Sequence, residues 1–219
     1  TAIGTALFEG ENWQARLGDI EKSDFTLDGV PLTDAEFDRL QAEAPATDIV
    51  VHFLDPDHNA EDGALLAQSI LYPGGAIASD GGSWSLDGGE IASDVWPLPA
   101  AAESHPRSAG TFSKFLRVYV RERQSLSLSE ALAKVSLIPA QILEDAVPQM
   151  RRKGRLQEGA DADIVIFDME TVSDRATYEE PAQPSVGFEY VIVAGTPLVW
   201  QGELDTSVMP GRAVRRTDA

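Results

Sequence analysis

The pattern of apolar residues changes about two thirds of the way along the chain. Of all the features of the sequence, this change most limits the folds that the chain can adopt. Before residue 146, short apolar runs at 49–53 and 76–79 read as strands. They alternate with segments 33–43 and 61–70, which read as helices. Alternation of this kind favours parallel βαβ units. Because the remainder is rich in strands, we expect an α/β chain with a small β-rich appendage.

Capping motifs and apolar spacing locate the helices. Thr33 is followed three residues later by Glu36, and Ser127 by Glu130, so each pair fits a capping box that begins a helix. Apolar residues on one face predict another helix over residues 111–123.

The last third carries the signals of an antiparallel sheet. Strands are predicted at 163–168, 190–193 and 197–200, and the glycine turn at 194–196 makes the last two a hairpin. Near the start of the chain, the mixed residues 13–20 are interpreted as a short strand.

Composition excludes several classes of partner. The 219 residues carry 17 Lys and Arg against 36 Asp and Glu, a net charge of −19, so we expect no binding to nucleic acid or anionic membranes. With no cysteine, the chain has neither disulfides nor thiolate metal ligands. No apolar run approaches the roughly 20 residues that span a bilayer. There is no signal-peptide hydrophobic region at the start, and we expect a cytoplasmic protein.

Asp80 is the first candidate for chemistry because of its position. It ends the expected strand 76–79 and opens a glycine-rich loop over residues 81–99. In β/α folds, ligands gather at the carboxyl ends of strands, where a carboxylate can bind a metal or transfer a proton. The alternative is an aspartate that caps a turn beside Gly81.

The sequence His105-Pro106-Arg107 closes the glycine-rich loop and precedes a predicted helix. The guanidinium fork of Arg107 suits a substrate carboxylate, and His105 joins it as a candidate substrate-binding residue. The alternative is a surface arginine in a loop. The other two histidines, His52 and His58, are not spaced with His105 as a local metal site.

Several segments carry a resemblance to the D-aminoacylase family of amidohydrolases, from about residue 48 to the C-terminus. The segments are residues 78–81, 105–112, 127–132 with 138–140, 154–168, and 174–181. The segment 154–168 is common to many amidohydrolases, whereas 105–112 and 174–181 are more specific to this family. Residues 58–62 are similar to the branch that acts on D-glutamate derivatives.

The resemblance implies a metal-dependent (β/α)8 barrel, of the TIM type, with a small β domain. Residues 1–145 would then supply the last strands and helices of the barrel, including a seventh strand at 49–53 and an eighth at 75–79. Residues 146–219 would form the C-terminal part of the small β-sandwich domain.

The resemblance also implies a reaction, the hydrolysis of N-acyl-D-amino acids to a carboxylate and a free D-amino acid. N-acyl-D-glutamate is a candidate substrate. Zinc would activate a water molecule and polarise the amide carbonyl. Asp80, also a metal ligand, would take the proton from this water and pass it to the departing amine. Arg107 would hold the α-carboxylate of the small-molecule substrate.

The family's other metal ligands, which include an N-terminal His-x-His, have no counterpart in this sequence. We therefore expect a fragment that is inactive alone and that needs the missing N-terminal half of the barrel or an oligomeric partner. Two alternatives remain: an amidohydrolase of cyclic amides, like hydantoinase or dihydroorotase, and a non-catalytic remnant module.

Overall fold

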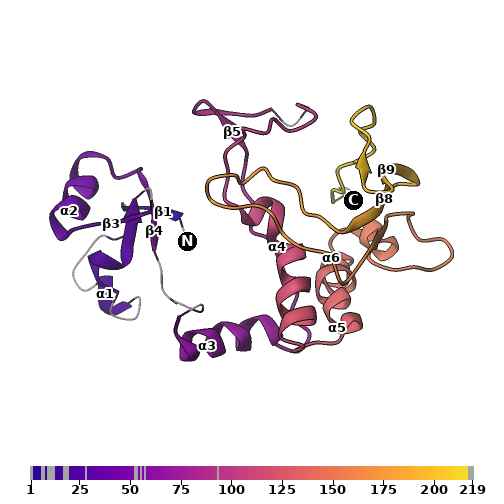
Figure 1. Cartoon of the computed structure of the whole chain (residues 1–219), viewed down its shortest axis with the longest axis horizontal. Coiled ribbons are helices and arrows are strands. Elements are labelled where there is room, and N and C mark those ends of the chain that lie inside the picture. Colours follow the sequence, from indigo (N-terminus) through magenta and orange to yellow (C-terminus); the bar gives the residue numbers. More distant parts are fainter. Residues whose placement is uncertain are drawn as a thin grey trace. The chain divides into compact units, whose positions relative to one another are not determined.

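The chain forms two compact units, Thr1–Ser69 and Ile70–Ala219, whose elements are labelled in Figure 1. The computed structural model describes residues 2–5, 8, 13–16, 20–27, 29–51, 54, 56, 58–92 and 94–216.

An antiparallel sheet in the order β1-β4-β2-β3 organises the described part of the first unit. Its strands are β1 (Ala2–Gly4), β2 (Phe25–Leu27), β3 (Val30–Pro31) and β4 (Asp48–Val51). In β4, Val50 lies opposite Ala2 of β1 and Thr26 of β2. The strand predicted at 49–53 is thus confirmed up to Val51, while residues 52 and 53 lie outside the described part.

The first predicted capping box is present. Helix α2 (Asp34–Glu43) begins after Thr33, whose hydroxyl accepts a hydrogen bond from the Glu36 N–H at 3.3 Å. The Glu36 carboxylate accepts the Thr33 N–H at 2.9 Å in return. These bonds satisfy backbone donors that a helix leaves free at its start.

Aromatic rings fill the core of the first unit. Phe8, Phe25 and Phe37 pack with Trp13, whose ring stacks on Phe37 with centroids 5.6 Å apart. Trp13 belongs to the single helical turn α1 (Trp13–Arg16), so the strand predicted at 13–20 is wrong for its first four residues. Residues 17–19 lie outside the described part. Burial of the indole among three rings outweighs a mixed local propensity.

The parallel βαβ pairing expected for the first two thirds does not occur among the described residues, where every strand pair is antiparallel. Residues 76–79 form no strand. The N–H of Ile77 instead donates to the carbonyl of Lys134 at 3.0 Å. The run at 49–51 pairs instead with β1 and β2, both antiparallel.

Helix α3 (Ala60–Leu71) confirms the helix predicted at 61–70. The Asn59 side chain caps its start by accepting the N–H of Glu61 at 2.9 Å. Beyond its end, the Lys134 ammonium donates to the carbonyls of Tyr72 at 2.5 Å and Gly75 at 3.0 Å. Lys134 is only 5% exposed, so this buried cation fixes the chain that leads toward Asp80.

Helices make up the first half of the second unit. Helix α4 (Arg107–Phe115) runs into a π-helical stretch, η3 (Leu116–Glu122), and this confirms the helix predicted at 111–123 but starts it four residues earlier. Ser127 and Glu130 form the second predicted capping box. The elements that follow it are α5 (Leu128–Leu132), η4 (Ala133–Leu137), α6 (Ile138–Leu143) and η5 (Pro148–Arg152).

The last third is β-rich, as predicted. The sheet order is β10-β9-β8-β7, with strands β7 (Ile164–Phe167), β8 (Phe188–Val193), β9 (Thr196–Trp200) and β10 (Glu203–Leu204). The β8–β9 turn has Ala194 at φ 50° and Gly195 at φ 80°, as a two-residue hairpin loop requires. A smaller hairpin, β5 (Ser85–Leu86) with β6 (Gly89–Glu90), lies within the glycine-rich loop.

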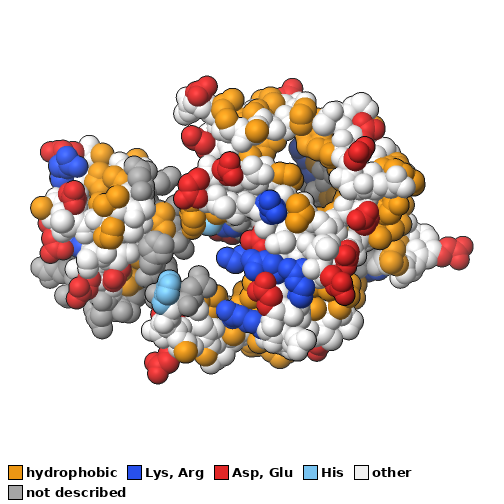
Figure 2. All heavy atoms as spheres, in the orientation of Figure 1, with side chains coloured by type: hydrophobic (Ala, Val, Ile, Leu, Met, Phe, Trp, Pro, Cys, Tyr) orange, Lys and Arg blue, Asp and Glu red, His pale blue; other side chains and the backbone are white. Residues whose placement is uncertain are grey.

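The second unit exposes both apolar and charged side chains. Val165, Ile166 and Trp200 of its sheet are each about half exposed, at 50%, 49% and 55%. On the face drawn in Figure 2, Lys and Arg side chains lie next to Asp and Glu side chains. Within the described residues, no helix combines the length and the hydrophobicity needed to cross a membrane.

Candidate functional site

Asp80 lies on an irregular segment with a left-handed backbone, at φ 49°. Side-chain hydroxyls hold the backbone that follows. Ser79 Oγ accepts the N–H of Gly81 at 3.3 Å, and Ser108 Oγ accepts that of Gly82 at 3.2 Å. The Asp80 side chain is 88% exposed, so its carboxylate is presented to solvent rather than used in packing.

The Arg107 side chain binds both the backbone and the side chain of Asp80. Nε donates to the Asp80 carbonyl at 2.6 Å, and Nη2 lies 3.2 Å from Asp80 Oδ2. Arg107 is the first residue of α4, and its side chain is about one third exposed. The structure therefore brings together the two residues that the sequence selected separately, which lie 27 positions apart.

His105 lies beside this pair, two residues before the start of α4. Its Nδ1 accepts the backbone N–H of Arg107 at 3.1 Å, which satisfies one of the free donors of the first helical turn. Burial lowers the pKa of His105, and the positive charge of Arg107 lowers it further. The ring is therefore held neutral near pH 7, where an unperturbed histidine is already largely deprotonated.

Tyr178 completes the cluster, and sequence reasoning assigned it no role. Its hydroxyl lies 3.2 Å from His105 Nε2, and the two rings meet edge to face with centroids 5.1 Å apart. The available signal was its position in the segment 174–181, one of the two more specific segments of the resemblance.

Polar contacts with the α4–η3 helix hold the segment that carries Tyr178. Arg117 Nε donates to Asp174 Oδ1 at 2.9 Å, and its Nη2 forms an ion pair with the same oxygen at 2.9 Å. Ser113 Oγ donates to Ser185 Oγ at 2.7 Å. Gly110 permits this close approach, since a Cβ atom there would lie 3.1 Å from the Asp174 Cβ. Tyr178 is thereby tied to the helix whose first turn carries Arg107.

The described residues do not fit a metal ion. Nowhere among them do three His, Asp or Glu side chains gather as metal ligands. Asp80 is the ligand expected from the sequence, but its Oδ2 is paired with Arg107. These residues alone therefore do not form a metal site.

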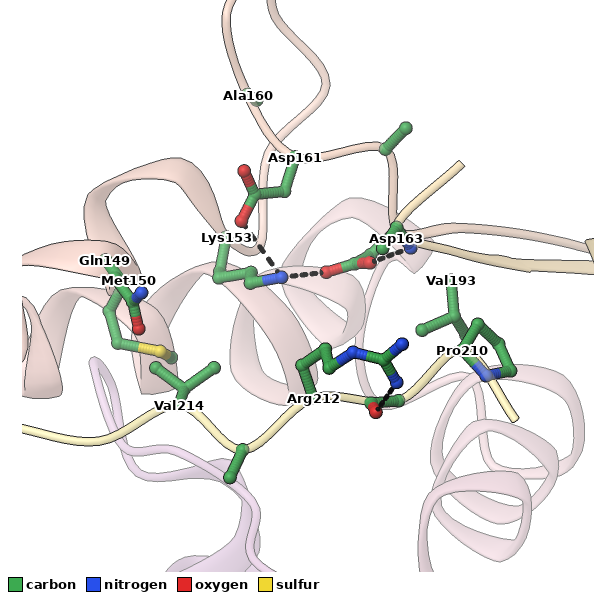
Figure 3. A pocket seen from close by; sticks show the side chains of 14 residues that line it. Gln149, Met150, Lys153, Ala160, Asp161, Asp163, Val193, Pro210, Arg212 and Val214 are labelled. Atoms are coloured by element: carbon green, nitrogen blue, oxygen red, sulfur yellow. Dashed lines mark hydrogen bonds and ion pairs between the residues drawn. The ribbon is translucent and has the colours of Figure 1, made fainter. Parts of the chain in front are cut away.

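A cavity of about 700 Å³ lies elsewhere in the second unit, between η5, the β8–β9 turn and residues 210–214 (Figure 3). It does not include Asp80, His105, Arg107 or Tyr178 among its lining residues. Lys153 projects between two carboxylates in Figure 3, at 3.0 Å from Asp161 Oδ2 and 2.5 Å from Asp163 Oδ2. Arg152 Nη2 lies 3.3 Å from Asp161 Oδ1 as well. Because these two cations balance the two carboxylates, the cavity offers less to a charged ligand than the Arg107 cluster does.

The Lys153–Asp163 pair should make stability depend on pH. The bond to Lys153 lowers the pKa of Asp163, and the bond to Asp163 raises that of Lys153. The contribution of Asp163 is thus complete above its unfolded pKa, near 3.8, and is lost as the pH falls through its lower folded value. That of Lys153 is complete below 10.5 and is lost as the pH rises through its higher folded value.

We expect Asp163→Asn to lower the free energy of unfolding by about 1 kcal/mol at neutral pH, a modest figure because the side chain is 35% exposed. The variant and the parent should converge in acid, below the folded pKa of Asp163. Urea unfolding at both pH values measures this difference. Asp145→Asn, at a side chain that is 95% exposed, is the matched control and should change stability little. A pH-independent loss for Asp163→Asn would contradict the ion-pair account.

The chain belongs to the amidohydrolase family, whose model matches residues 10–199. Among particular relatives, it is 42% identical over 119 residues to the N-acyl-D-glutamate deacylase of Alcaligenes xylosoxydans xylosoxydans, which covers 54% of this chain and 23% of the relative. The N-acyl-D-glutamate deacylase of Bordetella bronchiseptica, solved with zinc and a phosphonate inhibitor, is similar at 30% identity and a TM-score of 0.56. That similarity covers 92% of this chain and 33% of the solved one.

A crystal structure of D-aminoacylase is also similar, with 28% identity and a TM-score of 0.58 over 83% of this chain and 32% of that one. These comparisons confirm the resemblance to the D-aminoacylase family. The chain corresponds to about a quarter to a third of the length of these relatives. The roles assigned to Asp80, His105 and Arg107 stay predictions.

Proposed function

We propose that this chain is part of a zinc-dependent enzyme that hydrolyses the amide bond of N-acyl-D-amino acids to a carboxylate and a free D-amino acid. The observation that carries the proposal is the Arg107–Asp80 pair, with Nε at 2.6 Å from the Asp80 carbonyl and Nη2 at 3.2 Å from Oδ2. It unites an anion-binding group with a group that can transfer protons. The similarity to N-acyl-D-glutamate deacylases supplies the substrate class, and N-acyl-D-glutamate is the first substrate to test.

Arg107 is proposed to bind the α-carboxylate of the substrate. A guanidinium can hold a carboxylate through two parallel N–H donors, which fixes the direction of the ligand as well as its charge. Among the described residues, Nη2 meets the Asp80 carboxylate and Nη1 meets no acceptor. A substrate carboxylate can therefore use Nη1 and displace Asp80 from Nη2, so that binding of substrate releases Asp80.

Asp80 is proposed to move the proton in the reaction. Once released from Arg107, its carboxylate can accept a proton from the attacking water and deliver it to the departing amine nitrogen. The left-handed backbone at φ 49° and the two serine bonds that follow it set the position of this carboxylate. Arg107 then aligns the scissile amide with Asp80, and such alignment lowers the entropic part of the barrier.

Zinc is proposed as the cofactor from similarity to the zinc-bound deacylase. Asp80 is the proposed ligand among the described residues, where no three potential ligands gather, and we propose that the other ligands come from outside the described part. The proposed fold follows the same reasoning. Residues 1–145 would contribute the last strands and helices of a (β/α)8 barrel, and residues 146–219 part of a small β-sandwich domain.

An assay of the protein that contains this chain tests the function directly. We expect zinc-dependent release of the amino acid from N-acetyl-D-glutamate and other N-acyl-D-amino acids, and little release from the L enantiomers. Hydrolysis of a hydantoin in preference to these substrates would favour the cyclic-amide alternative. If zinc-loaded protein of the full length of its relatives hydrolyses neither N-acyl-D-amino acids nor the hydantoin, the proposal is wrong.

A further inference from the structure

Hydrogen-bond counting around His105 points to a second donor for the substrate. Its Nδ1 accepts the backbone N–H of Arg107 at 3.1 Å, so this nitrogen carries no proton. A neutral imidazole has one N–H, which must then be on Nε2. Nε2 lies 3.2 Å from the Tyr178 hydroxyl and therefore donates to the oxygen of this hydroxyl.

The direction of that bond leaves the Tyr178 hydroxyl proton available. A phenol oxygen that accepts from His105 keeps its own O–H to donate to another group. Among the residues that the structure describes, His105 is the hydrogen-bond partner of Tyr178, and the side chain is 64% exposed. The O–H is thus free to meet a ligand from solvent.

The side chain of Tyr178 is also held in place more firmly than that of an ordinary exposed residue. Asp174 and Arg117 anchor its segment, and the edge-to-face contact with His105 limits the rotation of its ring. One imidazole ring links it to Arg107, whose Nη1 meets no acceptor among the described residues. Two unused donors, one charged and one neutral, therefore belong to one connected cluster.

We propose that the Tyr178 hydroxyl donates a hydrogen bond to the substrate carboxylate that Arg107 holds, with His105 as the positioning residue that orients this hydroxyl. The proposal rests on the proposed function, because it names a second group at the same site. Arg107 supplies the charge, and Tyr178 fixes one oxygen of the carboxylate. The substrate class is an amino acid derivative with a free α-carboxylate.

The test is Tyr178→Phe in the active protein, assayed on N-acetyl-D-glutamate. The phenyl ring keeps the contact with His105, so the fold should not change. Loss of a hydrogen bond to a charged group should raise KM about 10-fold or more, with kcat nearly unchanged. The same variant should lose much less kcat/KM on an analogue whose α-carboxylate is replaced by a carboxamide, because the amide oxygen accepts only a weaker, neutral hydrogen bond. Tyr72→Phe is the matched control, since Tyr72 is 68% exposed and lies outside the cluster.

The outcomes separate this proposal from the function on which it rests. If Tyr178→Phe leaves KM unchanged while replacement of Arg107 raises it, the role of Tyr178 is overturned and the proposed function stands. If neither replacement changes KM for a carboxylate substrate, both proposals fail. An equal loss on the carboxamide analogue would show that Tyr178 acts on the fold rather than on the carboxylate.

Discussion

Replacing Asp80 by Asn should lower kcat for N-acyl-D-amino acid hydrolysis by about 10²–10⁴-fold, the usual contribution of a positioned acid–base group. Asparagine keeps the shape of the side chain but cannot take a proton from water. It also tolerates the left-handed backbone at φ 49°, where alanine would add strain. Steady-state kinetics on N-acetyl-D-glutamate, with circular dichroism to verify the fold, measure the effect.

Asp87 provides the control for this experiment. It lies in the same glycine-rich loop and has a similar backbone, at φ 52°, but it is not part of the Arg107 cluster. Asp87→Asn should therefore leave kcat near the parent value. Near-normal turnover of Asp80→Asn would remove Asp80 from the reaction, whatever Asp87→Asn does.

Replacing Arg107 by Lys should raise KM for N-acyl-D-amino acids by about 10- to 100-fold, since hydrogen bonds to a charged group contribute about 1.5–3 kcal/mol. Lysine keeps the positive charge but lacks the fork that holds two carboxylate oxygens. The variant also loses the Nε bond to the Asp80 carbonyl, so kcat should fall as the carboxylate becomes less well placed.

The dependence on substrate charge identifies the cause. An analogue with a carboxamide in place of the α-carboxylate should lose much less affinity for the Arg107→Lys variant than the acid does. Arg151→Lys, at a side chain that is 61% exposed, is the matched control. An unchanged KM for the acid would exclude Arg107 as the group that holds the carboxylate.

Elements that depend on neighbouring residues were predictable from the sequence. The two capping boxes and the β8–β9 hairpin appear where the sequence predicted them, because a cap or a tight turn is decided by side chains within a few positions. Trp13 shows where such reasoning fails. Its helical turn depends on packing with Phe25 and Phe37, and local propensity does not report that packing.

The strand predicted at 76–79 failed for a similar reason. A small-residue run has no strong preference of its own, and its backbone here is bound by Lys134 from a helix far along the chain. At the site, position and resemblance selected Asp80 and Arg107. Tyr178 was not predicted, because its partner His105 lies 73 residues away in the sequence. Neither periodicity nor spacing can reveal a contact between residues so far apart.

The buried Lys134 side chain makes local opening of the segment before Asp80 measurable. Its ammonium is shielded while it donates to the carbonyls of Tyr72 and Gly75, so an amine-acylating reagent can reach it only when this part of the chain opens. The rate of acylation at Lys134 therefore counts opening events of the segment that leads into Asp80. Acylation would also remove the charge that closes the segment, so each labelled molecule would be trapped in its open form.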